Sequence, residues 1–257
     1  SLSGAVVLCI GLWFQLGNLN TNILPWVIIA AGLVWVLAII VFLGIYEPKV
    51  SDTESEQSVS IWKTLSQDAL LRRFILARSL LLCSALSAPF YVTLAQGSDI
   101  TNVGILGIII VVTGVASMLS SPIWGHMADR SSRRVMSYSG FLGALLALGV
   151  TVTLYFDIFE NSVVFYAFII LLVSIAHNGV RVGRKTYIVN IAEGNLRITY
   201  VSASNTVIAI VLLFVGGMTS LLSTFSITWA IGILGVMGFV GSYLSHHLPD
   251  ARESEAV

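Results

Sequence analysis

The charged residues with the clearest chemical potential lie together in one short segment, residues 125–134, which reads Gly-His-Met-Ala-Asp-Arg-Ser-Ser-Arg-Arg. It combines one carboxylate, Asp129, with the guanidinium groups of Arg130, Arg133 and Arg134. A carboxylate in such a place can pair with arginines or accept from free N–H groups at a helix start, and arginines can bind helix carbonyl ends or anionic lipid headgroups. This chemistry suits the fixing of helix ends at a membrane surface.

The rest of the chain holds no pattern that would predict catalysis. It has no Gly-rich phosphate loop with its Lys, no His and Cys spacing suited to a metal, and no paired intramembrane carboxylates. It also lacks a basic surface with interleaved aromatic residues for nucleic acid. We therefore expect no enzyme, no cofactor, no bound metal and no nucleic-acid partner.

The composition indicates that the elements on either side of the charged segment are apolar. Hydrophobic residues make up 56% of the chain and charged residues 10%, and the mean hydropathy is +0.92. A helix that crosses the ~30 Å hydrocarbon layer needs roughly 20 mainly apolar residues. The sequence predicts an all-α integral membrane protein with eight such helices, over residues 2–16, 24–46, 74–96, 102–124, 135–156, 162–180, 200–222 and 226–246.

Lys and Arg predict the orientation, because they gather on the cytoplasmic side of inserted helices. Threading eight helices through the membrane puts all 13 of them on one face. The connections expected on the opposite face carry none, and they are 17–21, 97–101, 157–161 and 223–225. We expect a protein of a bacterial cytoplasmic (inner) membrane, in contact with the lipid bilayer, with both ends of this chain in the cytoplasm.

Residues 47–73 form the largest polar connection, between a pair of helices in 1–46 and six helices in 74–246, and residues 247–257 form a cytoplasmic tail. The first part of the connection is acidic and rich in Ser, which predicts a flexible linker. In the second part Ile61, Trp62, Leu65 and Ala69 share one helical face. This pattern predicts an amphipathic helix at the membrane interface, serving as a lead-in to the next span.

The segment 125–134 resembles a motif of the major facilitator superfamily, in which a Gly is followed by three residues, an Asp, a basic residue, any residue, a Gly and two basic residues. The family places this motif between the second and third helices of a six-helix half, where the segment also falls. One position departs from the pattern, since Ser132 stands where the family usually has Gly. The resemblance implies a cytoplasmic latch formed by Gly125, Asp129, Arg130, Arg133 and Arg134. A basic loop that only sets topology is the alternative.

A second cytoplasmic cluster lies between the predicted fourth and fifth helices of the same half, and it resembles the corresponding loop of the family. Its members are Arg181, Arg184, Lys185, Glu193 and Arg197. With this alignment the six helices after the linker match the C-terminal half of a major-facilitator-like fold, and the first pair matches the end of the N-terminal half. The expected partners are then the missing N-terminal helices of the same protein, with the chain a fragment or processed product.

Transporters of this family work by alternating access around a site near the bilayer midplane. Polar residues spaced along one face of a helix are therefore the candidates for lining a cavity: Ser84, Ser87, Tyr91, Tyr166, Ser174, His177 and Asn178. Pro89 removes a backbone donor beside the first three and predicts an irregular helix there. The alternative is that Ser and Asn only bond neighbouring helices and Tyr lies in the interfacial belt.

Two functions of different classes remain. The favoured one is part of a secondary-active or facilitative permease that moves an unknown small-molecule substrate by alternating access. The alternative is a non-transporting membrane module for partner binding or ligand sensing. The recurrence of Gly232, Gly235, Gly238 and Gly241 predicts close packing of the last helix in either case.

Overall fold

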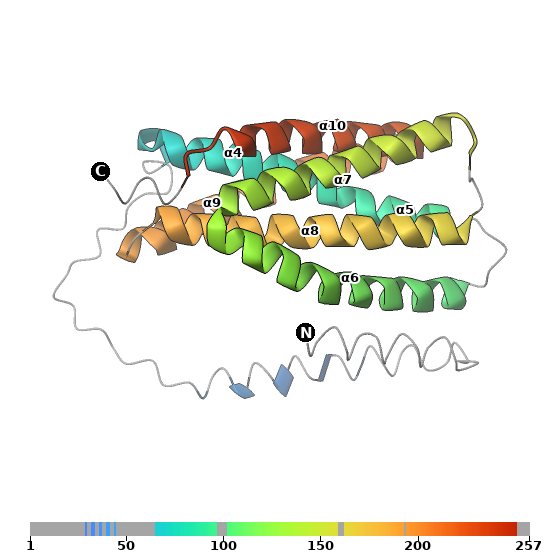
Figure 1. Cartoon of the computed structure of the whole chain (residues 1–257), viewed down its shortest axis with the longest axis horizontal. Coiled ribbons are helices and arrows are strands. Elements are labelled where there is room, and N and C mark those ends of the chain that lie inside the picture. The colour runs from blue at the N-terminus through green and yellow to red at the C-terminus, as the bar shows by residue number, and fades with distance from the viewer. Residues whose placement is uncertain are drawn as a thin grey trace.

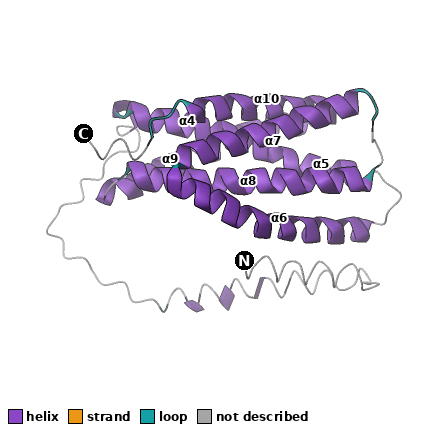
Figure 2. Cartoon of the chain, in the orientation of Figure 1, coloured by secondary structure: helices purple, strands orange, loops and turns teal. Residues whose placement is uncertain are grey.

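The computed structural model describes residues 65–96, 102–158, 162–192 and 194–250, with eight further positions between 29 and 44. The expected helices at 2–16 and 24–46, the linker before residue 65, Glu193 and the tail from residue 251 lie wholly or mostly outside this part. Everything described is helix, turn or short connection, with no strand among these residues (Figure 2). The prediction of an all-helical protein is confirmed for them.

The bundle consists of helices that lie roughly alongside one another (Figure 1). In chain order they are α4 (Ala69–Ser84), η2 (Ala85–Ser87), α5 (Ala88–Gln96), α6 (Asn102–Arg130), α7 (Ser132–Tyr155), α8 (Val163–Ile191), α9 (Gly194–Ser223) and α10 (Ile227–His246). With α4, η2 and α5 counted as one, they give six helices in the described residues that are long and apolar enough to cross a membrane. This supports an integral membrane protein.

Two prolines shape the helices that contain them. The helical pattern tightens to a 3₁₀ turn over Ala85–Ser87, which ends two residues before Pro89, and Pro89 has no N–H to donate to an earlier carbonyl. The predicted irregularity is thereby confirmed. Pro122 lies inside α6, and α6 bends toward its C-terminal end (Figure 1).

Neighbouring helices pack in the order α4, α10, α7, α8, α6, and α9 lies against α4 and α10. Helix α10 packs closely against α4, as the glycine spacing predicted. A Cβ on Gly238 would lie 2.9 Å from the Cβ of Ser84, and one on Gly241 would lie 2.9 Å from the backbone N of Leu81. Only glycine fits at these two positions without a shift of α4.

Serine hydroxyls add polar links across the α7–α10 contact. The Ser137 hydroxyl donates to the Ser242 carbonyl at 3.2 Å, and the Ser242 hydroxyl donates to the Ser137 carbonyl at 2.7 Å. Both side chains are buried. The pair bonds one helix backbone to the other twice.

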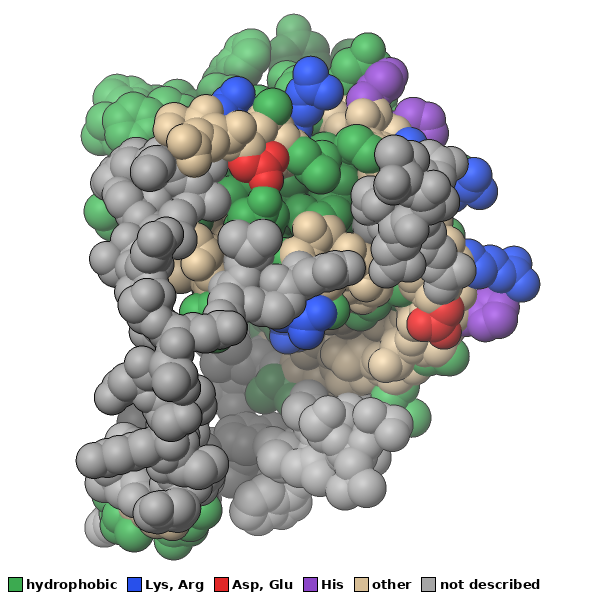
Figure 3. Space-filling model, turned by 90° about the vertical axis from the view of Figure 1, so that its left-hand side faces the viewer, with side chains coloured by type: hydrophobic (Ala, Val, Ile, Leu, Met, Phe, Trp, Pro, Cys, Tyr) green, Lys and Arg blue, Asp and Glu red, His purple; other side chains and the backbone are tan. Residues whose placement is uncertain are grey.

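All described Lys and Arg side chains belong to one end of the bundle, where α4, α7 and α9 begin and α6, α8 and α10 end. We call this the basic end, and Figure 3 shows cationic and His side chains over it. Its members are Arg72, Arg73, Arg78, Arg130, Arg133, Arg134, Arg181, Arg184, Lys185 and Arg197. The described residues of the opposite end carry Asp157 and no Lys or Arg.

Candidate functional site

The segment 125–134 is a helix junction, whereas the sequence predicted a ten-residue loop. α6 continues to Arg130 and α7 begins at Ser132, so Ser131 alone separates them. Helix α6 continues because apolar side chains still have partners there: Trp124 and Ala128 are buried in a cluster that includes residues of α8. Burial of an apolar face thus extends the helix through its charged end.

Ser131 performs the helix-capping role that was expected of Asp129. Its backbone is extended, and its hydroxyl accepts from the N–H of Arg134 at 3.4 Å, which is the N-cap arrangement. The same hydroxyl donates to the Asp250 carboxylate at 3.0 Å. Asp129 instead lies exposed in the last turn of α6.

Arg133 ties the start of α7 to the end of α10. Its guanidinium donates to the carbonyl oxygens of His246 at 3.3 Å and Leu248 at 2.9 Å. It also lies 3.7 Å from the Asp250 carboxylate. These carbonyls belong to the negative end of the α10 dipole, so a cation is favoured there. The expected binding of helix carbonyl ends is confirmed for Arg133, while Arg130 and Arg134 are exposed.

A close approach beside this junction is made by Gly183 of α8 and not by Gly125. No described atom lies within 4 Å of a Cβ built on Gly125. A Cβ on Gly183 of α8, by contrast, would lie 3.0 Å from the carbonyl oxygen of Ser132 and 2.9 Å from the backbone N of Met136. Ser132 is itself buried, so the position where the family usually has Gly is a packing position here.

The second basic cluster is also helical. The sequence predicted that the span ends at residue 180, but α8 continues to Ile191 and carries Arg181, Arg184 and Lys185. It continues because Tyr187 and Ile188 are buried in the same core cluster as Phe74 of α4. Arg197, at the start of α9, donates to the Val189 carbonyl at 3.2 Å and to the Ala192 carbonyl at 3.4 Å, and so caps the end of α8.

The three candidate cavity residues of α4, η2 and α5 are buried within the bundle. Ser84 and Ser87 each donate to a carbonyl of their own helix, at 2.7 Å to Leu81 and 2.8 Å to Ser84. Tyr91 lies in a core cluster with Val173 of α8, and its hydroxyl is buried without a hydrogen-bond partner. Their common face therefore points at other helices of the same bundle.

The candidates on α8 divide between packing and polar contact. Tyr166 is buried against Ala95 and Ile105. The side-chain amide of Asn178 donates to the Ser120 hydroxyl at 3.0 Å and links α8 to α6. Ser174 and His177 are half-buried on the same helix.

Two polar links that sequence reasoning missed join helices far apart in the chain. The indole N–H of Trp124 donates to the Ile175 carbonyl at 2.8 Å, between α6 and α8. On α4, the Arg78 guanidinium donates to the Ser204 hydroxyl at 2.6 Å and to the Asn205 side-chain oxygen at 2.9 Å, both on α9. The sequence predicted that this helix starts at residue 74, but α4 begins at Ala69, so Arg78 lies further from the helix start than predicted.

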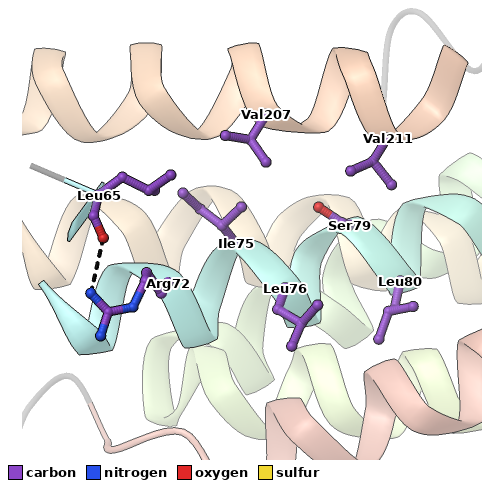
Figure 4. A pocket seen from close by; sticks show the side chains of 8 residues that line it. All are labelled: Leu65, Arg72, Ile75, Leu76, Ser79, Leu80, Val207 and Val211. Atoms are coloured by element: carbon purple, nitrogen blue, oxygen red, sulfur yellow. Dashed lines mark hydrogen bonds between the residues drawn. The ribbon is translucent and has the colours of Figure 1, made fainter. Parts of the chain in front are cut away.

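A groove of about 250 Å³ lies between α4 and α9 near the basic end (Figure 4). Its walls are almost wholly apolar, and they are formed by Leu65, Arg72, Ile75, Leu76, Ser79, Leu80, Val207 and Val211. Arg72 donates to the Leu65 carbonyl at 3.0 Å at one end of it. Ser79 contributes a buried hydroxyl without a hydrogen-bond partner.

Comparison with known proteins found no match, neither to a family model nor to a curated protein sequence nor to a solved structure. No relative therefore supplies a role for any of these side chains. Inferences about function depend on the residues and contacts of this chain.

Proposed function

We propose that the chain forms part of a permease that moves a small solute across a membrane by alternating access. The single observation that carries the proposal is the junction of α6 and α7. There the spaced Gly, Asp and Arg residues of a motif that resembles the major facilitator superfamily lie at a helix junction on the basic end of a six-helix bundle. A loop that only sets topology would need the arginines alone.

The contacts of Arg133 suggest how such a junction would work as a latch. Arg133 holds the end of α10, and Ser131 and Asp250 complete the same small network. Asp129, Arg130 and Arg134 are exposed beside it at the surface of the bundle. We propose that these exposed charges contact the N-terminal half of the transporter and stabilise one of its two states.

The distribution of cations supports an orientation. Because Lys and Arg gather on the cytoplasmic side of inserted helices, we propose that the basic end faces the cytoplasm of a bacterial cell. The eight-helix topology, with the first two helices in residues 1–46 and both ends of the chain in the cytoplasm, belongs to the same proposal.

The second candidate is a non-transporting membrane module that binds a partner or senses a ligand. One observation favours it: Ser84, Ser87 and Tyr91, which share a face, are buried against other helices of the bundle. A module needs close packing of this kind but no cavity. Transport measurements separate the two candidates.

The decisive experiment uses the full-length protein in proteoliposomes, after a screen of small solutes for those that raise its melting temperature. For a solute that binds, we expect uptake by the wild type and at least about tenfold slower uptake by Asp129→Asn, since tenfold corresponds to ~1.4 kcal/mol in a barrier. Asp157→Asn is the matched control. It makes the same change in an exposed residue at the opposite end, where the left-handed backbone, φ 53°, suits Asn as well as Asp.

Solute binding with no uptake by the wild type would contradict the permease and leave the sensing module. Equal uptake by wild type and Asp129→Asn would contradict the latch. Both variants should retain wild-type solute binding and membrane insertion.

A further inference from the structure

Four cationic or titratable side chains lie near one another on α4 and α8, of which Arg78, His177 and Arg184 are half-buried and Arg181 is exposed. His177, Arg181 and Arg184 are spaced at i, i+4 and i+7 and therefore share one face of α8. Arg184 is close enough to Arg78 of α4 for the two charges to repel, and Arg181 acts in the same way on both Arg184 and His177. We call these four residues the inner basic cluster.

An aromatic stack between α4 and α8 aligns the two helices next to this cluster. Phe74 of α4 and Tyr187 of α8 are stacked with ring centroids 5.1 Å apart. Arg78 is one turn beyond Phe74, its guanidinium 6.0 Å from that ring, and Arg184 is one turn before Tyr187. Because α4 and α8 run in opposite directions, both steps lead away from the basic end and bring the two arginines to the same level.

The cluster lies well inside the helices. At 1.5 Å per residue, Arg78 is about 14 Å from the start of α4 at Ala69, and Arg181 is about 15 Å from the end of α8 at Ile191. His177 is the middle residue of α8. The side chains of Arg78 and Arg184 are half-buried, and burial of a positive charge is costly unless the charge is paired and hydrogen-bonded.

The described residues do little to offset the positive charge of this cluster. Arg78 bonds two neutral side chains, Ser204 and Asn205, and its Nε is buried without a partner, as is the Nε of Arg184. The ion pair found among the described residues, between Arg133 and Asp250, is elsewhere. A group that accepts several N–H donors and carries negative charge would match this arrangement.

We propose that the inner basic cluster binds the oxyanion of a carboxylate or phosphate group on the transported solute, so that the substrate is a small anion. This inference rests on the proposed function, of which it names the substrate class. The planar guanidinium groups of Arg78 and Arg184 bind the oxyanion through paired N–H donors, and Arg181 adds charge on the same face. A lipid headgroup offers the same chemistry, and the phosphatidylglycerol arm of the test below distinguishes it from a free anion.

The test measures the melting temperature of the full-length protein in lipid-free micelles with increasing sodium citrate or inorganic phosphate. Sodium chloride holds the ionic strength constant, because screening alone changes the repulsion within the cluster. We expect at least one of the two anions to raise the melting temperature with saturation. Arg184→Gln should weaken this binding by about tenfold or more, as for loss of a charged hydrogen-bond donor. Arg184→Lys, which keeps the charge but loses the paired donors, should weaken it less.

Arg73→Gln is the matched control, because Arg73 is an exposed arginine on α4 outside the cluster, and it should bind the anion as the wild type does. Three results would overturn the proposal: no stabilisation by either anion, equal loss in Arg73→Gln and Arg184→Gln, or stabilisation by added phosphatidylglycerol alone. If Arg184→Gln does not fold, Arg181→Gln provides the same test.

Transport of the bound anion distinguishes this proposal from the permease. Anion binding without uptake in proteoliposomes would contradict the permease and leave the anion site in place. Uptake of a neutral solute that is unaffected by Arg184→Gln would contradict the anion site and leave the permease.

Discussion

At the scale of a single residue, the Arg133 side chain links the start of α7 to the end of α10. Its guanidinium donates to the carbonyls of His246, the last residue of α10, and Leu248, and lies near the Asp250 carboxylate, which also accepts from Ser131. The neighbouring Arg134 has the same side chain but is exposed. Two arginines in sequence therefore differ in function because α7 presents them to different surroundings.

We predict that Arg133→Gln lowers the free energy of unfolding by about 1.5–3 kcal/mol, because hydrogen bonds made by charged groups are worth roughly that much. Arg134→Gln should change it by less than about 0.5 kcal/mol, as expected for an exposed position. Equilibrium unfolding in mild detergent measures both values. Equal effects would show that Arg133 contributes only general charge at the basic end.

Two roles are compared for the side chain of Asn178: a contact between helices and a contact with substrate. Its amide bonds the Ser120 hydroxyl between α8 and α6. Polar contacts of this kind between membrane helices are worth about 0.6 kcal/mol on average. We predict that Asn178→Ala lowers the free energy of unfolding by this amount and leaves the affinity for a bound solute unchanged. A large loss of affinity in a ligand titration would instead assign Asn178 to the site.

At the scale of elements, the glycines of α10 allow this helix to approach α7 and α4 closely. Gly235 faces Ala147 of α7, with a built Cβ 3.1 Å from the Ala147 methyl group, and Gly238 faces Ser84 of α4. Because these glycines have no side chain, α10 packs closely against both α7 and α4. Ser137 and Ser242 add hydrogen bonds to the same α7–α10 contact.

We predict that Gly238→Ala lowers the melting temperature, because overpacking of a close contact costs typically 1–3 kcal/mol. Gly149→Ala on α7 is the matched control, since no described atom lies within 4 Å of its added methyl group. That change should be neutral or stabilising by up to about 1 kcal/mol, the difference in helix propensity. A loss of stability in Gly149→Ala as large as in Gly238→Ala would contradict the packing explanation.

At the scale of the whole molecule, the bundle separates its charges by end. The described Lys and Arg residues occupy the end where α6 and α8 finish, and the turns at the other end carry none. The proposed orientation follows from this asymmetry together with the preference of cations for the cytoplasm.

We predict opposite labelling of two engineered thiols by a membrane-impermeant maleimide. In a background with Cys9→Ala and Cys83→Ala, Thr224→Cys should react in intact cells, because Thr224 is exposed at the end without Lys or Arg. Arg134→Cys, exposed at the basic end, should react only after the membrane is opened. Labelling of Arg134→Cys in intact cells would reverse the proposed orientation.

The sequence by itself determined the all-helical architecture and the helices of the described bundle. Long apolar runs leave the backbone no partner in lipid except its own helix, and Pro89 predicted the local change at Ala85–Ser87. The asymmetry of cations and the close packing of α10 could likewise be read from residue types and spacing.

The tertiary structure decided where the helices end and which charges lie inside them. Sequence reasoning ended two spans before their charged segments, at residues 124 and 180. Yet α6 continues to Arg130 and α8 to Ile191, because apolar residues beyond these points are buried by neighbouring helices. The same contacts brought Arg78 to Ser204 and Asn205, and near Arg184. Pairing between residues more than a hundred positions apart depends on which helices become neighbours, and local patterns of hydropathy do not carry that information.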